Sequence, residues 1–89
     1  MKKHDLKILP EHFAAVVSGE KKAEIRINDR DYAVGDLLRL AEYSQFPWSG
    51  GLVGFSTEFI WVRVTHITDL SEWLPGYVML SIERGPFKS

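Results

Sequence analysis

The sequence predicts a small, mainly β domain of the α+β class, in which about five strands form a closed or nearly closed barrel capped by one short N-terminal helix. The order of elements is the first observation: one strand, one helix and then four strands follow one another within 89 residues. Composition is the second, because 45% hydrophobic and 26% charged residues are typical of a globular protein with a real core. No repeat or linker interrupts the pattern, so we expect residues 1–89 to form a single domain.

The first strand and the helix are predicted near the start of the chain. Residues 4–9 (HDLKIL) include alternating polar and apolar side chains, which is typical of a strand with one buried face. Pro10 fits the first turn of a helix, where its missing N–H is not needed. Phe13 and Val16 then fall on one helical face, and Gly19 is placed to end the helix.

Two further strands follow the helix. In the segment AEIRIND, Ile25 and Ile27 alternate with Glu24 and Arg26. We therefore expect a strand with its isoleucines in the core and its two charges on the opposite face. The leucine-rich segment DLLRLAEY, residues 36–43, predicts the third strand.

Residues 44–57 (SQFPWSGGLVGFST) predict a long loop rather than a regular element, because proline and glycines interrupt the segment. Loops of this length in compact domains are usually functional or disordered. Phe46, Trp48 and Phe55 lie in it. Two interpretations of these aromatic residues stay open: they stack on nucleic-acid bases, or they fold back over an open end of the barrel.

The last two strands carry the clearest pattern. Residues 58–67 (EFIWVRVTHI) are rich in β-branched and aromatic side chains, and Val62 and Val64 alternate onto the face expected to be buried. We expect a short turn at residues 68–76 and the final strand at residues 77–83 (YVMLSIE).

Composition excludes several classes of function. The chain has no cysteine, which excludes a disulfide framework, a thiol nucleophile and a cysteine zinc site. Its three histidines, His4, His12 and His66, match no metal-ligand spacing, so we expect no metal and no cofactor. The first apolar run is too short for a signal peptide, and no stretch is long enough to cross a bilayer. We therefore expect a cytoplasmic protein without a membrane partner.

The net charge of −1 hides an asymmetry along the chain. Residues 1–30 carry seven basic and five acidic side chains, whereas residues 31–89 carry four basic and seven acidic ones. Tight, sequence-independent binding to duplex DNA needs a larger basic surface. A pocket for one nucleotide remains compatible with this charge.

A dense group of charges within residues 18–35 contains the candidate site. Glu24 and Arg26 are two residues apart and share one face of the predicted strand, and Lys21 lies just before it. An ordinary solvated turn and a charged ligand site both explain this spacing. If the face is solvated, the ion pair contributes little to stability.

At these residues the sequence resembles the ASCH domain, a member of the PUA-like superfamily of small β-barrels. Gly19, Lys21, Glu24 and Arg26 reproduce the ASCH motif G-x-K-x-x-E-x-R. The resemblance covers nearly the whole chain except residues 44–57, and it points to a bacterial and phage branch whose function is unassigned. It implies a cleft between helix and barrel that binds RNA or a modified nucleotide.

The resemblance also implies roles for individual residues. Lys21 and Arg26 would donate to a phosphate or a base carbonyl, while Glu24 would accept from an exocyclic amine or hold Arg26 in place. Trp48, or its neighbour Phe46, would cover a base lifted out of its stack. The expected ligand-binding residues are therefore Lys21, Glu24, Arg26 and Trp48, with RNA or a nucleotide as the partner.

An enzymatic alternative stays open. Some ASCH proteins hydrolyse the amide of N-acetylated cytidine with a lysine, a threonine of the motif and a later glutamate. Lys21 matches the lysine, but no residue between it and Glu24 has a hydroxyl group. Glu72 or Glu83 would be the later acid; in a simpler mechanism, Glu24 would be the general base and Lys21 would stabilise the oxyanion.

A second alternative is an interaction domain of a phage or mobile element that binds a host protein through Trp48 and its loop. For all of these functions we expect a monomer.

Overall fold

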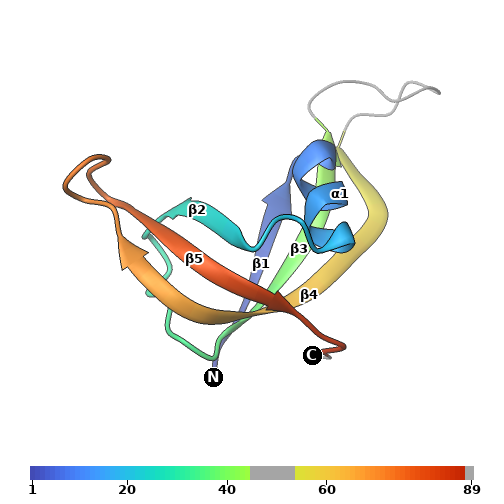
Figure 1. The fold of residues 1–89 in the computed structure, drawn as a ribbon. Helices are drawn as coiled ribbons and strands as arrows, with labels where there is room; N and C mark the ends of the chain where they lie inside the picture. Colours follow the sequence, from blue (N-terminus) through green and yellow to red (C-terminus); the bar gives the residue numbers. More distant parts are fainter. Residues whose placement is uncertain (45–53, 88–89) are drawn as a thin grey trace.

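The computed structural model describes residues 1–44 and 54–87, which form one helix and five strands in the expected order (Figure 1). The elements are β1 (Lys3–Ile8), α1 (Pro10–Ser18), β2 (Ala23–Ile27), β3 (Leu37–Ser44), β4 (Gly54–Asp69) and β5 (Tyr77–Arg84). The prediction of a small, mainly β protein with one short N-terminal helix is therefore confirmed. No helix in the described part of the chain is long and apolar enough to span a membrane.

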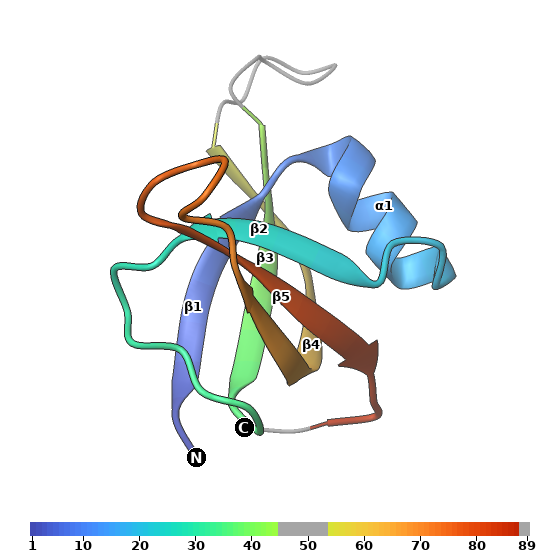
Figure 2. The same ribbon diagram turned by 60° about the vertical axis from the view of Figure 1, so that its left-hand side comes forward.

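All five strands belong to one sheet with the order β1-β3-β4-β5-β2. β1 and β3 run parallel, and the other neighbouring pairs are antiparallel. The long strand β4 pairs with β3 through its first part and with β5 through its second part, and its register shifts between Val64 and His66. Such a bulge bends a strand. The sheet curls accordingly, so that β2 comes round towards β1 (Figures 1 and 2).

The sheet is not closed into a barrel. β1 and β2 are its two edges, and no backbone ladder joins them. Instead, the side chains of Arg26 and Arg30 reach from the β2 side to carbonyl oxygens of β1. The two arginine side chains bind backbone carbonyl groups of β1 that a neighbouring strand would otherwise bind, so the sheet stays open between β1 and β2. We call this gap between β1 and β2 the seam.

The core lies inside the curled sheet and receives side chains from four strands, the helix and the β2–β3 connection. Its buried cluster consists of Leu6, Ile8, Val16, Tyr32, Leu38, Leu40, Val62, Val64, Val78, Leu80 and Ile82. The predicted inward face of β4 is confirmed at Val62 and Val64, which are 0% and 1% exposed. β2 contributes no residue to this cluster, which sets it apart from the other strands.

The expected orientation of β2 is wrong. Ile25 and Ile27 are each 54% exposed, whereas Glu24 is only 7% exposed. The alternation is present as predicted, but the charged face points inward. This orientation is possible because partners inside the curled sheet pair with the charges, so that Glu24 is buried without being left unsatisfied.

Part of the predicted loop belongs to a strand. β4 begins at Gly54, and Phe55 is paired with Tyr43 across the antiparallel ladder. The interpretation of Phe55 as a loop residue is therefore wrong. Phe46 and Trp48 lie outside the described residues. The short turn expected between the last two strands is confirmed.

A buried polar network fixes the start of β1 against the start of β3. Asp36 is 2% exposed and His4 is 7% exposed, and His4 Nε2 lies 2.9 Å from Asp36 Oδ2. The Asp36 carboxylate also accepts the backbone N–H groups of Lys2 and Ala33, each at 3.0 Å. Burial acts to raise the pKa of Asp36, but these three hydrogen bonds outweigh it and hold the pKa below its usual range.

Replacing Asp36 with alanine is expected to lower the free energy of unfolding by about 3 kcal/mol, because His4 and two backbone N–H groups lose their acceptor. Urea unfolding at neutral pH, followed by circular dichroism, measures the loss.

The lowered pKa of Asp36 also makes the stability of the protein depend on pH. The stabilisation by Asp36 is present above the ordinary pKa of 3.8 and is lost as the pH falls through the lower folded-state value. Below about pH 4 the wild type should lose stability more steeply than Asp36→Ala; equal slopes would contradict this account.

Candidate functional site

The candidate site begins where α1 ends. Gly19 has a φ angle of 87°, in the left-handed region that glycine adopts without strain. A Cβ at this position would lie 2.7 Å from Nη2 of Arg84. Arg84 Nη1 donates to the Val17 carbonyl oxygen at 2.7 Å. The glycine therefore ends the helix and also leaves room for an arginine that binds the Val17 carbonyl group in the last turn.

The same helix end positions Lys21. Its backbone N–H donates to the Ala15 carbonyl oxygen at 3.0 Å. Its Nζ donates to the Ala23 carbonyl oxygen and lies 3.1 Å from Glu24 Oε1. With contacts at both its backbone and its ammonium group, the lysine has a defined direction towards Glu24.

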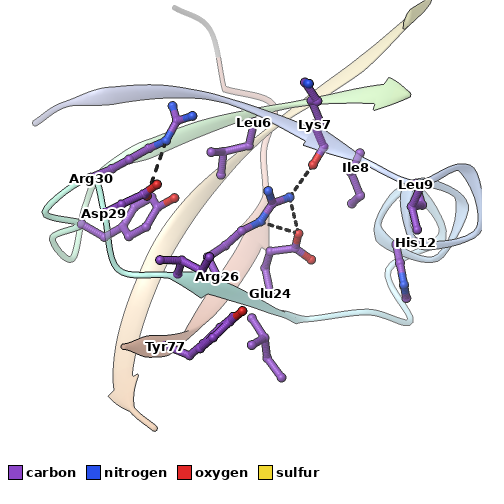
Figure 3. Close-up of a pocket in the computed structure, with 13 residues that line it drawn as sticks. Leu6, Lys7, Ile8, Leu9, His12, Glu24, Arg26, Asp29, Arg30 and Tyr77 are labelled. Carbon is purple, nitrogen blue, oxygen red and sulfur yellow. Dashed lines mark hydrogen bonds and ion pairs between the residues drawn. The ribbon is translucent and has the colours of Figure 1, made fainter. Parts of the chain in front are cut away.

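Glu24 lies between two cations. Arg26 donates to Glu24 Oε2 from Nε at 2.9 Å and from Nη2 at 2.5 Å (Figure 3), while Lys21 pairs with the other carboxylate oxygen. A buried carboxylate is costly unless it is paired and hydrogen-bonded, and here both oxygens are engaged. Three of the four expected ligand-binding residues are thus brought together, whereas Trp48 lies outside the described residues.

Arg26 also connects the two edges of the sheet. Its Nη2 donates to the Lys7 carbonyl oxygen at 2.6 Å (Figure 3). Arg30, in the turn after β2, donates from Nη1 to the Asp5 carbonyl oxygen at 3.0 Å. The two acceptors are alternate residues on the free edge of β1, whose carbonyl groups would otherwise need water.

A cleft of about 370 Å³ opens beside Glu24 and Arg26; we call it the Glu24 cleft (Figure 3). This volume falls within the range of about 300–1,000 Å³ that is typical of small-molecule sites. Its lining combines charged, aromatic and aliphatic side chains: Leu6, Lys7, Ile8, Leu9, His12, Glu24, Ile25, Arg26, Ile27, Asp29, Arg30, Tyr32 and Tyr77.

Several residues of the cleft could not be predicted from the sequence. Tyr77 comes from β5 and His12 from α1, and no local pattern connects either of them to Glu24. Of Tyr77, His12 and Arg30, only Arg30 could have been suspected from the sequence, since it belongs to the charged residues within 18–35. Burial raises the pKa of Tyr32, although the charges of Arg26 and Arg30 act against it. The Tyr32 phenol therefore stays protonated at neutral pH and can donate a hydrogen bond.

The charged lining of the cleft contains both signs. Glu24 and Asp29 supply carboxylate acceptors, and Arg26 and Arg30 supply cationic donors. Lys7 faces Arg26 with its carbonyl oxygen, while its ammonium group points away from the cleft (Figure 3). Such a lining suits a ligand that presents donors and acceptors side by side. Among the described residues, no group of three His, Asp or Glu side chains gathers that could hold a metal ion.

Of the two later acids considered for hydrolysis, Glu83 lines a separate hollow of about 370 Å³ together with Lys21, whereas Glu72 does not line it. Glu72 belongs to the turn between β4 and β5, which contacts the far end of β2 through the hydrogen bond from Asn28 to Gly76. Glu83 forms an ion pair with Arg63 on the neighbouring strand.

Comparison with known proteins identifies a family without an assigned activity. The model of a domain of unknown function, DUF3850, matches residues 3–82. An uncharacterized 12.9 kDa protein in the GpA 3′ region of Escherichia phage P2 is 40% identical over 77 residues. The match covers 86% of this chain and 64% of the phage protein, so the chain spans less than two thirds of that relative.

Gly19→Ala is expected to lower the free energy of unfolding by about 2 kcal/mol, because alanine is strained at a positive φ and its Cβ displaces Arg84. Gly76→Ala is the matched control: its φ is 84°, but nothing lies within 4 Å of the added Cβ. The control should lose about 1 kcal/mol, from backbone strain alone. Thermal and urea unfolding of both variants measure the difference, and equal losses would mean that Arg84 does not depend on the glycine.

Glu24→Ala is expected to lower the free energy of unfolding by about 3 kcal/mol, because Lys21 and Arg26 are left without their shared acceptor. Glu72→Ala, at an exposed turn position, should stay within about 0.5 kcal/mol of the wild type. Urea unfolding of the two variants side by side is the measurement. A loss at Glu24 as small as at Glu72 would be inconsistent with a buried, paired carboxylate.

Proposed function

The chain belongs to the family of the domain of unknown function DUF3850, and we propose that it is a nucleic-acid-related binding module that takes RNA or a modified nucleotide in the Glu24 cleft. The observation that carries the proposal is a buried carboxylate, flanked by Lys21 and Arg26, at the side of a cleft of about 370 Å³. This site places a fixed acceptor and fixed cationic donors next to each other.

A nucleobase edge matches that arrangement, because it also presents donors and acceptors side by side. Glu24 or Asp29 would accept from an exocyclic amine. The hydrogen bonds of Arg26 within the described structure use Nε and Nη2, which leaves the N–H groups of Nη1 for a base carbonyl or a phosphate.

We also propose that the fold is PUA-like and of the ASCH type. Support comes from the four motif residues, which build one continuous set of contacts from the end of α1 to β1. The curled five-stranded sheet, open along one seam, is compatible with a small barrel of that kind. Kinship of fold does not name a function, so the functional proposal rests on the cleft.

Hydrolysis of an N-acylated cytidine has less support. The residues between Lys21 and Glu24 offer no hydroxyl nucleophile, and both oxygens of the Glu24 carboxylate are already engaged by Lys21 and Arg26. The protein-binding alternative draws on other residues. Trp48 is outside the described residues, but the outer face of β2 exposes Ile25 and Ile27.

The proposal is tested by nuclear magnetic resonance titration of the isotope-labelled protein with nucleosides, N-acetylcytidine and short single-stranded RNA. At least one ligand is expected to shift the signals of Lys21, Glu24 and Arg26. Lys21 does not line the cleft, but it holds Glu24, which does. Lys21→Ala should therefore weaken the binding about tenfold, because the Glu24 carboxylate loses one of the two cations that fix it. Lys22→Ala is the matched control, since this neighbouring lysine is exposed and should bind like the wild type.

Each other outcome points to a different function. Acetate released from N-acetylcytidine by the wild type, but not by Lys21→Ala, would establish hydrolysis instead of simple binding. No shift with any ligand would contradict the proposal. The next experiment would then be a search for a protein partner whose binding is lost in Trp48→Ala.

A further inference from the structure

A second hollow of about 300 Å³ lies on the outer side of the seam, against β1 and β3. Four cations line it, namely Lys7, Arg26, Arg30 and Arg39, together with one acid, Asp5. We call it the basic hollow. Because the Asp5 carboxylate is 80% exposed and lies 3.7 Å from Arg39, it screens the four cations only weakly.

Aromatic rings hold two of these cations in place. The Arg39 guanidinium lies over the ring of Phe59, 4.2 Å from its centre, and Lys7 Nζ lies 4.9 Å from the centre of the Tyr43 ring. A ring attracts a cation through its face without taking up the N–H donors in the plane of a guanidinium. Arg39 is therefore oriented while its donors are still able to bind an anion.

Backbone carbonyl groups hold the other two cations. Arg30 uses one N–H of Nη1 on Asp5, and Arg26 uses Nη2 on Lys7. Arg26 also donates from Nε and Nη2 to Glu24, which leaves its Nη1 for an anion. A guanidinium has five N–H donors in a rigid fork, so neither contact exhausts the group. Cations that are already ordered lose less entropy when they bind an anion than free side chains do.

The Glu24 cleft and the basic hollow share part of their lining, but they favour ligand groups of different charge. Leu6, Lys7, Arg26 and Arg30 line both of them. The Glu24 cleft also contains two carboxylates, Glu24 and Asp29, which repel an anion, whereas the basic hollow contains one exposed acid against four cations. A ligand with a polar base and a phosphate would therefore place the base in the cleft and the phosphate in the hollow.

We propose that the basic hollow is a phosphate subsite, lined by Lys7, Arg26, Arg30 and Arg39, for the phosphate group of a nucleotide whose base occupies the Glu24 cleft. This inference rests on the proposed function and deepens it. The ligand class becomes a nucleoside phosphate, either free or within a single strand, rather than an uncharged nucleoside.

The test compares the affinities of four nucleosides, adenosine, cytidine, guanosine and uridine, with those of their 5′-monophosphates, measured by calorimetry at low salt. At least one monophosphate is expected to bind about tenfold more tightly than its nucleoside, and added salt should reduce this difference. Arg39→Gln should abolish the difference and leave the nucleoside affinity unchanged. Arg39→Lys, which keeps the charge but not the fork, should retain part of it.

Arg63→Gln is the matched control, because Arg63 is an exposed arginine on the same face of the neighbouring strand and lies outside the hollow. It should keep the full difference. If nucleosides bind but monophosphates bind no more tightly, or if the difference survives in Arg39→Gln, the phosphate subsite is refuted and the proposed function stands. If neither nucleosides nor monophosphates bind, the phosphate subsite is refuted, and the titration with N-acetylcytidine and single-stranded RNA decides the proposed function separately.

Discussion

The rest of the structure depends on the burial of one carboxylate. Glu24 is 7% exposed, and an ion so far removed from water must be paired on both of its oxygens. Lys21 and Arg26 meet this requirement from either side. Their positions in turn need a helix that ends at Gly19 and a strand that runs close to β1. The spacing of Gly19, Lys21, Glu24 and Arg26 is therefore explained by the need to pair the buried Glu24 carboxylate with two cations.

The open seam follows from the same demand. If β1 and β2 formed a backbone ladder, the side chain of Arg26 would have no carbonyl group to reach and the space beside Glu24 would close. With the edges apart, Arg26 and Arg30 bind the free carbonyl groups of β1 in place of a neighbouring strand. Backbone hydrogen bonds between β1 and β2 are therefore absent, and the Glu24 cleft, bordered by charged side chains with fixed positions, lies between the two strands. Side-chain contacts of this kind also leave less unpaired strand edge exposed to other chains.

Local pattern was enough to predict the elements of the fold but not the side on which β2 is buried. β1, α1 and β2 could be predicted from the spacing of apolar residues and from Pro10 and Gly19, because those signals act within a few residues of the chain. Alternation in β2 defines two faces, yet burial of Glu24 rather than Ile25 depends on Arg26 meeting a carbonyl group of β1, far away in the sequence. The pair of His4 and Asp36 escaped prediction for the same reason. His4 does take a buried position in the alternation with Leu6 and Ile8, but its acceptor lies 32 residues later.

The pairing of Glu24 also limits how a ligand can bind beside it. A ligand that separated Glu24 from Lys21 and Arg26 would have to compensate for a buried charge, a cost of about 3 kcal/mol or more. A ligand that left the three side chains together would avoid that cost and would gain from donors that are already oriented, such as Nη1 of Arg26. The site therefore favours ligands that add contacts to the existing ion pairs over ligands that replace them. A base edge in the cleft joined to an anion at Arg39 satisfies this condition, because its charge lies where the protein has no buried carboxylate to displace.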